Sequence, residues 1–306
     1  MRQEFYSNGK LLLTGEYAVL DGAKALALPT TFGQFLTVEP SKNKGLFWRS
    51  LDKEGKVWFE MEVDLGTMHI RTSTHTSNAN TALKILIEAQ RLQPDFLTHE
   101  GGYDLSTQLT FPKDWGLGSS STLINNIAQW AKIDPYKLLA TTFGGSGYDI
   151  ACAQHNTPIT YQWVQGAPIV EAVEFNPEFN NELYFVYLKK KQNSRDGILQ
   201  YRKQTFNKNE LIQVIGNLTS KIMASKDIDS FETLLNLHET VISNTIRIPT
   251  IKEQLFSEYP RAIKSLGAWG GDFILVIGDD ASMGYFRQRG YETIIPFSEM
   301  ILKKKS

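Results

Sequence analysis

The amino-acid sequence predicts an α+β fold, in which strands and helices are mixed but do not alternate regularly along the chain. The first observation is that residues 10–65 form short apolar or alternating runs separated by glycine and proline, as strands and turns do. The second is that later segments carry apolar residues at the spacing of an amphipathic helix. Strands that follow one another without intervening helices favour antiparallel pairing over a parallel βαβ sheet.

The expected elements of the first half follow from these local patterns. Val57, Phe59, Met61 and Val63 alternate as in a half-buried strand, and Pro94 ends a helical pattern. Strands are expected at residues 10–14, 25–28, 34–39, 46–50, 56–63, 103–111 and 159–164. Helices are expected at residues 79–90 and 123–131, after the Asp134-Pro135 cap, and after the glycine-rich residues 144–147.

The second half is expected to be rich in helices. Helices are predicted at residues 197–203, 210–224, 228–244 and 250–256, and strands at residues 183–188, 273–277 and 292–295. The chain has 306 residues, which at about 150 residues per domain indicates two domains. The composition changes near residues 165–168, so the expected domains are residues 1–165 and 166–306.

Composition and charge exclude several classes of function. The chain has 32 basic and 33 acidic residues, a net charge of -1, which gives no general basic field for nucleic acid, and the lysines at 303–305 are read as a solvated end. The single cysteine, Cys152, excludes an internal disulfide and lies in an apolar run, so a buried helical position is expected, with a reactive thiol as the alternative. No apolar run approaches the ~18 residues of a membrane span, and we expect a cytoplasmic protein without a membrane partner.

The most informative segment is the glycine- and serine-rich loop at residues 112–122, which leads into a helical pattern. Glycines before a helix N-terminus expose backbone N–H groups to an anion, and serine hydroxyls add contacts to phosphate oxygens or to Mg²⁺. The loop lacks the lysine of a Walker A motif. The pattern therefore indicates a phosphate site, with a glycine turn followed by serine caps as the alternative.

Two further glycine-bearing segments are ambiguous when taken alone. Residues 144–151 place Asp149 at a helix start, where a carboxylate is either a cap or a functional acid. Residues 264–273 place several small residues before an apolar strand, which indicates either a close approach of the backbone to a ligand or a tight turn.

Together, and in this order, four segments resemble the GHMP small-molecule kinases. These segments are residues 8–20, with Gly-Glu-Tyr-Ala-Val at 15–19, the Gly-Leu-Gly-Ser-Ser loop at 116–120, Ser-Gly-Tyr-Asp-Ile-Ala at 146–151, and Gly-Ala-Trp-Gly-Gly-Asp at 267–272. The resemblance spans almost the whole chain. Within the superfamily the segments look most like the mevalonate-pathway branch, that is, phosphomevalonate kinase and mevalonate kinase.

The resemblance implies a fold and an activity. The fold would be a two-domain GHMP-kinase-like α+β fold, with an N-terminal domain like domain 2 of ribosomal protein S5, a ferredoxin-like C-terminal domain, and the nucleotide between them. The activity would be phosphorylation of an isoprenoid-precursor acid, phosphomevalonate or mevalonate, with ATP and Mg²⁺. The sequence does not indicate the oligomeric state.

The resemblance also implies roles for individual residues. The catalytic residues would be Lys10 and Asp149, and Ser120 would bind Mg²⁺. We call residues 112–122 the first glycine loop and residues 264–273 the third glycine loop. The nucleotide would contact both, at Gly116, Leu117, Gly118, Ser119, Ser120, Ser121, Gly267, Ala268, Gly270, Gly271 and Asp272. The acceptor would contact Lys10, Glu16, Tyr17, Ser146, Gly147 and Asp149.

The identity of the acceptor decides what Asp149 does. An alcohol acceptor needs Asp149 as a base or to orient the hydroxyl. A phosphomonoester is already ionised near neutral pH, because its second pKa is about 6, and needs cationic contacts instead. Basic residues that lie after a predicted strand are candidates for these contacts, with an exposed basic loop as the alternative: Lys189, Lys190, Lys191, Arg195 and Arg202.

Several positions depart from the family pattern. Leu138 stands where the alcohol kinases carry a Mg²⁺-binding glutamate, and Trp269 replaces a glycine of the third loop. Thr122 replaces a small alanine, and residues 192–196 lack the usual Ser-Thr pair. These departures keep two alternatives open, a catalytically impaired ligand-binding protein and an ATP-dependent diphosphomevalonate decarboxylase.

Other polar and aromatic residues give no functional pattern. The five histidines are scattered without the spacing of a metal site: His69, His75, His99, His155 and His238. We interpret residues 72–78 as a mobile loop over the site or an ordinary surface connection. The tryptophans form no stripe with basic residues, so single-stranded nucleic acid is not an expected ligand.

Overall fold

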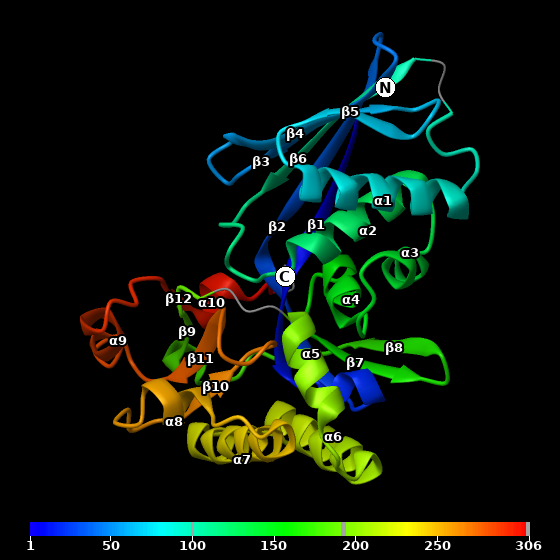
Figure 1. The fold of residues 1–306 in the computed structure, drawn as a ribbon. Coiled ribbons are helices and arrows are strands. Elements are labelled where there is room, and N and C mark those ends of the chain that lie inside the picture. The colour runs from blue at the N-terminus through cyan, green and yellow to red at the C-terminus, as the bar shows by residue number, and fades with distance from the viewer. Residues whose placement is uncertain (99–100, 191–193, 304–306) are drawn as a thin grey trace. The chain divides into compact units, whose positions relative to one another are not determined.

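The computed structural model describes residues 1–98, 101–190 and 194–303, and Figure 1 shows the course of the chain. Contacts group the chain into two compact units, each assembled from separate segments. Unit 1 contains residues 1–9, 32–113 and 117–154, and unit 2 contains residues 10–31, 114–116 and the chain from residue 155 onward. Several residues discussed above lie outside the described residues, or have side chains that do: His99, Lys191, Gln192, Asn193, Ser194, Arg195, Lys304 and Lys305.

Unit 1 is built on a mixed sheet in which most neighbouring strands are antiparallel. Its strands are the second part of β2 (Ala25–Ser41), β3 (Gly45–Leu51), β4 (Val57–Asp64), β5 (His69–Ser73) and β6 (Gly102–Leu109). Their order is β5-β4-β3-β6-β2, and β1 (Gln3–Thr14) also pairs with β2. Only β3 and β6 run parallel within this order, in agreement with the expected antiparallel character.

Helices cover one face of this sheet (Figure 1). They are α1 (Thr76–Leu92), α2 (Ser119–Ala131), α3 (Pro135–Thr142) and α4 (Tyr148–Gln154). The Asp134 carboxylate caps α3 by accepting the N–H of Tyr136 at 2.8 Å, as the sequence predicted. Cys152 is fully buried on α4, which confirms the expected buried helical position.

Unit 2 contains a second, fully antiparallel sheet, in the order β10-β11-β9-β12. Its strands are β9 (Leu183–Tyr187), β10 (Ile263–Ser265), β11 (Phe273–Ile277) and β12 (Ile294–Pro296). The hairpin of β7 (Ile159–Val164) and β8 (Ala167–Ala172) pairs with the first part of β2. The α+β fold class is therefore confirmed in both units.

Helices form the remainder of unit 2, and the long helices α6 and α7 lie side by side (Figure 1). The helices are α5 (Ser194–Lys203), α6 (Lys208–Ala224), α7 (Ile228–Ile246), α8 (Ile251–Leu255), α9 (Gly284–Gln288) and α10 (Phe297–Met300), with short 3₁₀ turns η1 (Ala18–Asp21) and η2 (Asn180–Glu182). Among the described residues, no helix combines the length and the apolar character that a membrane span requires.

One expectation about local structure was wrong. The strands expected at residues 25–28 and 34–39 are one continuous strand, β2. Pro29 interrupts neither ladder, because it lies between the residues that pair with β7 and those that pair with β6. Residues 72–78 include an exposed surface connection, the second of the two alternatives: they end β5, pass through Thr74 and His75 and begin α1, and the His75 side chain caps that helix. The capping contact is the His75 side chain, which accepts the N–H of Asn78.

The change in composition at residues 165–168 coincides with a tight hairpin turn. Gln165 and Gly166 both have positive φ, 50° and 83°, and connect β7 to β8. This geometry is typical of two-residue hairpin loops. The division into domains between residues 165 and 166 stays a prediction.

Candidate functional site

Three residues predicted for the kinase site meet in unit 2, although they lie far apart in the sequence. The Lys10 ammonium group donates a hydrogen bond to the carbonyl oxygen of Gly116 at 2.9 Å. The carboxylate of Asp272 packs directly on Gly116, where a Cβ atom would overlap it. A glycine is required at position 116 for this approach, and its φ of 68° also favours glycine.

The strands of unit 2 anchor the residues that precede Gly116. The Tyr187 hydroxyl donates to the Asp114 carboxylate at 2.9 Å, and the Trp115 ring packs edge-on against Phe273 at 5.3 Å. Since Tyr187 and Phe273 belong to paired strands, the start of the first glycine loop is fixed by the sheet.

Asp272 is held in an unusual backbone conformation. Its φ is 54°, in the left-handed region that non-glycine residues rarely adopt. Its N–H donates to the carbonyl of Lys190 at 2.7 Å, and its own carbonyl accepts the N–H of Leu188 at 2.8 Å. These bonds hold the carboxylate against the first glycine loop, and a strained residue held in this way indicates a functional position.

In unit 1, the first glycine loop continues into the N-terminus of α2. Gly118 is the N-cap residue with a φ of 91°, and among the described residues no side chain caps the helix there. The Ser121 hydroxyl is buried and donates to the Gly118 carbonyl at 2.8 Å, whereas Ser120 is exposed. The first-turn N–H groups and the Ser120 hydroxyl are therefore the groups of this segment suited to an anion.

The remaining residues of this segment are structural. Leu117 is fully buried, and the Thr122 hydroxyl donates to the Gln34 side-chain oxygen at 2.7 Å inside unit 1. This buried hydrogen bond satisfies the hydroxyl of Thr122, which stands where the family pattern has alanine. Leu138 is also fully buried in the core of unit 1, so the position offers no metal ligand.

The second glycine segment turns sharply before α4. Gly144, Gly145 and Gly147 have φ values of 67°, 111° and 87°, and Asp149 lies in the first turn of α4. Since α4 packs against α2, Ser146, Gly147 and Asp149 belong to the same unit as the serine-rich helix start. Burial, and then the negative charge of Asp149, raises the pKa of the Tyr136 phenol.

The third glycine loop, which includes Ala268 and Gly271, is open at two of its glycines. Gly267 and Gly270 have positive φ, and a Cβ atom added at either would meet no described atom within 4 Å. The side chain of Trp269 is 4% exposed and packs in a core cluster with Tyr17 and Tyr201. Its indole ring therefore lies in the core of unit 2 and not in the open part of the loop.

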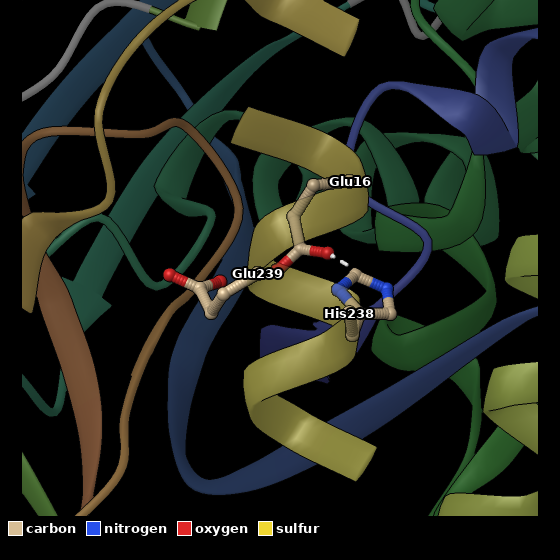
Figure 2. Close-up of side chains that lie close together, drawn as sticks. All are labelled: Glu16, His238 and Glu239. Carbon is tan, nitrogen blue, oxygen red and sulfur yellow. Dashed lines mark ion pairs between the residues drawn. The ribbon is translucent and has the colours of Figure 1, made fainter. Parts of the chain in front are cut away.

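A buried polar cluster in unit 2 was missed by the sequence reasoning. The side chains of Glu16, His238 and Lys264 are completely buried, and that of Glu239 almost completely. Figure 2 shows Glu16, His238 and Glu239 close together. The Lys264 ammonium group forms ion pairs with Glu16 and, at 2.9 Å, with Glu239. Ser265 donates to the other oxygen of Glu239 at 2.8 Å.

Burial controls the protonation of this cluster. Burial raises the pKa of Glu16 to about 7, although the Lys264 ammonium group opposes the change. Burial, assisted by the positive charge of Lys264, holds the pKa of His238 well below its usual value. Burial alone would lower the pKa of Lys264, but Glu16 and Glu239 together raise it above its usual value. His238 is therefore neutral, and its 3.5 Å contact with Glu16 is not a pair of opposite charges.

The cluster has donors for a metal ion but already contains a cation. Ligand atoms of Glu16, His238 and Glu239 lie within 4.8 Å of one another. Lys264 contacts both carboxylates and supplies the positive charge that a metal would bring. We therefore interpret the cluster as an ion-pair network.

One pattern in the sequence could have pointed to part of the cluster. One stripe of α7 is buried, and it carries His238 and Glu239 among apolar residues: Phe231, Leu235, His238, Glu239, Ile242 and Ile246. Lys264 likewise lies in a fully buried strand. The predicted contact of Glu16 and Tyr17 with the acceptor stays a prediction, since in this structure Glu16 contacts Lys264 and Tyr17 is buried.

The raised pKa of Glu16 predicts a pH dependence of stability. Glu16 has an ordinary pKa of 4.5 in the unfolded chain and a pKa of about 7 in the folded protein. Between about pH 4.5 and 7 the folded protein therefore keeps a proton on Glu16 that the unfolded chain has lost. The contribution of Glu16 to the free energy of unfolding therefore falls as pH rises through this window, by up to about 1.4 kcal/mol per pH unit. We expect urea unfolding of Glu16→Gln to lack this decline. The exposed-site variant Glu60→Gln should follow the parent, and equal slopes for Glu16→Gln and the parent would contradict the prediction.

The contact between Gly116 and Asp272 predicts the effect of a single methyl group. Gly116→Ala requires both a left-handed alanine and displacement of the Asp272 carboxylate. If this loop binds ATP, as the resemblance implies, we expect ATP affinity to fall about tenfold or more. Gly290→Ala is the matched control, because Gly290 has a φ of 84° and open space around it. Nucleotide titration of both variants tests this contact. Parental affinity in Gly116→Ala, or an equal loss in Gly290→Ala, would contradict the prediction.

The fold of this chain is similar to that of several proteins of known structure. No family model matches the sequence, and no curated protein is significantly similar to it. The crystal structure of Methanococcus jannaschii mevalonate kinase matches 99% of each chain at 14% identity with a TM-score of 0.70. Streptococcus pneumoniae phosphomevalonate kinase, solved with phosphomevalonate and AMPPNP, matches 94% of this chain and 95% of its own at 15% identity and a TM-score of 0.66. Mevalonate diphosphate decarboxylase from Staphylococcus aureus matches 96% of this chain and 94% of its own at 11% identity and a TM-score of 0.61.

Each match covers nearly the full length of this chain and of the solved structure. The chain therefore has the fold of the GHMP small-molecule kinases, as the four sequence segments implied. At this level of identity the likeness defines the fold, and the reaction and the acceptor depend on the residues themselves.

Proposed function

We propose that the protein is a cytoplasmic, ATP-dependent kinase of an isoprenoid-precursor acid, with phosphomevalonate as the first candidate and mevalonate as the second. The observation that carries the proposal is the meeting of Lys10, Gly116 and Asp272 at the start of the first glycine loop. Phosphoryl transfer requires mainly positioning and neutralisation of charge, which a lysine and a helix N-terminus are suited to supply.

The nucleotide would be bound by the glycine loops. The first-turn N–H groups of α2 would bind phosphate oxygens, and Lys10 would neutralise charge on the group being transferred. Gly267 and Gly270 would allow the nucleotide to approach the backbone of the third loop. Mg²⁺, when bound with ATP, would neutralise phosphate charge, and the exposed hydroxyl of Ser120 fits its preference for oxygen ligands.

Asp149 would act at the acceptor, beside Ser146 and Gly147. With an alcohol, its carboxylate would accept or orient the hydroxyl proton, and with a phosphomonoester it would mainly position the acceptor. The buried Leu138 supplies no carboxylate, which favours phosphomevalonate over mevalonate. Lys189, Lys190 and Arg202 are exposed, and they are candidates for contacts with an anionic acceptor.

Two alternatives have a specific observation behind them. The fold is shared with a diphosphomevalonate decarboxylase, whose reaction would release CO₂ as well as ADP. The missing carboxylate at Leu138 supports a catalytically impaired ligand-binding protein. Trp269 no longer supports that alternative, because its side chain packs into the core of unit 2.

The experiment is ADP release from Mg·ATP with phosphomevalonate, mevalonate, diphosphomevalonate, homoserine and galactose as acceptors. Turnover with phosphomevalonate or mevalonate, without CO₂, supports the proposal. CO₂ release with diphosphomevalonate would establish the decarboxylase, and turnover with homoserine or galactose would refute the choice of acceptor. ATP binding without turnover for any acceptor would favour the ligand-binding protein.

A further inference from the structure

We propose that His238 is a positioning residue that fixes the Gly15–Tyr17 turn, and thereby the acceptor side of the site. The inference rests on the proposed function for the role of that turn, but the contact itself is independent of any reaction. It is distinct from the family-derived roles above, because no sequence segment used for the resemblance contains His238.

The first step is the contact between the imidazole and the turn. The Nε2 atom of His238 accepts the backbone N–H of Gly15 at 3.1 Å, across a sequence separation of 223 residues. Both partners are buried, so an alternative partner from water is not available to the Gly15 N–H. Loss of the acceptor would leave a buried donor unsatisfied, which is costly.

The second step is that the turn needs to be held. Gly15 has a φ of 92°, and a Cβ atom there would lie 2.6 Å from the Cβ of Ala25. Tyr17 has a φ of 59°, which is unusual for a bulky residue. Two residues with positive φ on either side of Glu16 persist only where surrounding contacts determine them.

The third step is that the other groups around the turn also hold it. Lys264 at β10 pairs with Glu16, and the Tyr17 hydroxyl accepts the N–H of Trp269 at 3.1 Å. The charged groups that face His238 are Glu16, two residues after the end of β1, and Lys264 on β10, and Glu239 is its neighbour on α7. His238 therefore links α7 to the turn that carries Glu16 and Tyr17, which are the residues predicted to contact the acceptor.

The neutral form of His238 is the one that this role requires. Nε2 accepts a hydrogen bond from the Gly15 N–H, so the ring proton lies on Nδ1, which has no hydrogen-bond partner among the described residues. ¹⁵N NMR of histidine-labelled protein should show this tautomer for His238 from pH 6 to 8, identified by the signal lost in His238→Gln. A charged ring, or a proton on Nε2, would overturn the proposal.

The main test compares His238→Leu with His238→Gln. Leucine has a similar volume but no acceptor, whereas the glutamine amide can replace Nε2 as the acceptor. With the acceptor that the parent uses, we expect His238→Leu to raise KM for that acceptor about tenfold or more, with KM for ATP unchanged. His238→Gln should recover most of the difference, and Leu237→Ala, at an exposed position of α7, should match the parent.

Amide hydrogen exchange of Gly15 tests the contact with His238 without requiring enzymatic activity. We expect His238→Leu to accelerate exchange at Gly15 about tenfold or more relative to amides of β9 and β11, and His238→Gln to restore protection. Equal acceleration everywhere would show a general loss of stability and overturn the inference, as would unchanged exchange at Gly15. If the parent protein turns over no acceptor, the proposed function fails while this measurement still decides the role of His238.

Discussion

If the proposed function holds, Asp149→Asn should lower kcat at least about 100-fold while leaving ATP binding intact. The asparagine keeps the size and position of the side chain at the start of α4 but cannot accept a proton or carry a negative charge. If Asp149 removes the proton of an alcohol, kcat should fall by about 10²–10⁴-fold. A phosphomonoester acceptor depends less on a base, so the fall should be at the lower end of that range.

Steady-state kinetics with both substrates, together with ATP titration, measures this effect. Asp134→Asn is a suitable control, because Asp134 is a carboxylate of the same unit that only caps α3. We expect that variant to lose stability by about 1 kcal/mol or less and to retain kcat. An Asp149→Asn variant with parental kcat would remove Asp149 from the catalytic group and undermine the proposed function.

The glycine-bearing segments were predictable because their constraints are local. Gly118 must adopt a left-handed conformation where α2 begins, and Asp134 must cap α3, so each leaves a mark within a few residues of the chain. The correct order of four such segments was enough to predict the fold, which the solved structures then confirmed.

The buried cluster was not predictable in the same way. Glu16 and Lys264 are separated by 248 residues, and nothing near either residue indicates that the other is its partner. A charged residue in an apolar pattern is normally interpreted as exposed, because isolated buried charges are so unfavourable. Likewise, β2 continues through Pro29 only because two different neighbours pair with its two parts.

Lys264→Met should destabilise the protein by about 3–5 kcal/mol, the largest effect on stability that we expect from a single substitution here. The substitution removes the only cation that contacts both Glu16 and Glu239 among the described residues, and leaves two buried carboxylates close together. Their repulsion should be relieved by protonation, so the loss should be smaller at pH 5 than at pH 8. Urea unfolding at both pH values measures it.

Two comparisons separate loss of the ion pairs from loss of packing. Lys208→Met removes an exposed lysine that pairs with Asp21 at 2.8 Å, and it should cost about 1 kcal/mol or less. The triple variant Lys264→Met/Glu16→Gln/Glu239→Gln removes every charge of the ion-pair network and should recover much of the stability, because neutral groups of similar volume need no counter-charge. A triple variant as unstable as Lys264→Met would mean that the lysine contributes through packing, and that the network is not what holds Glu16 in place.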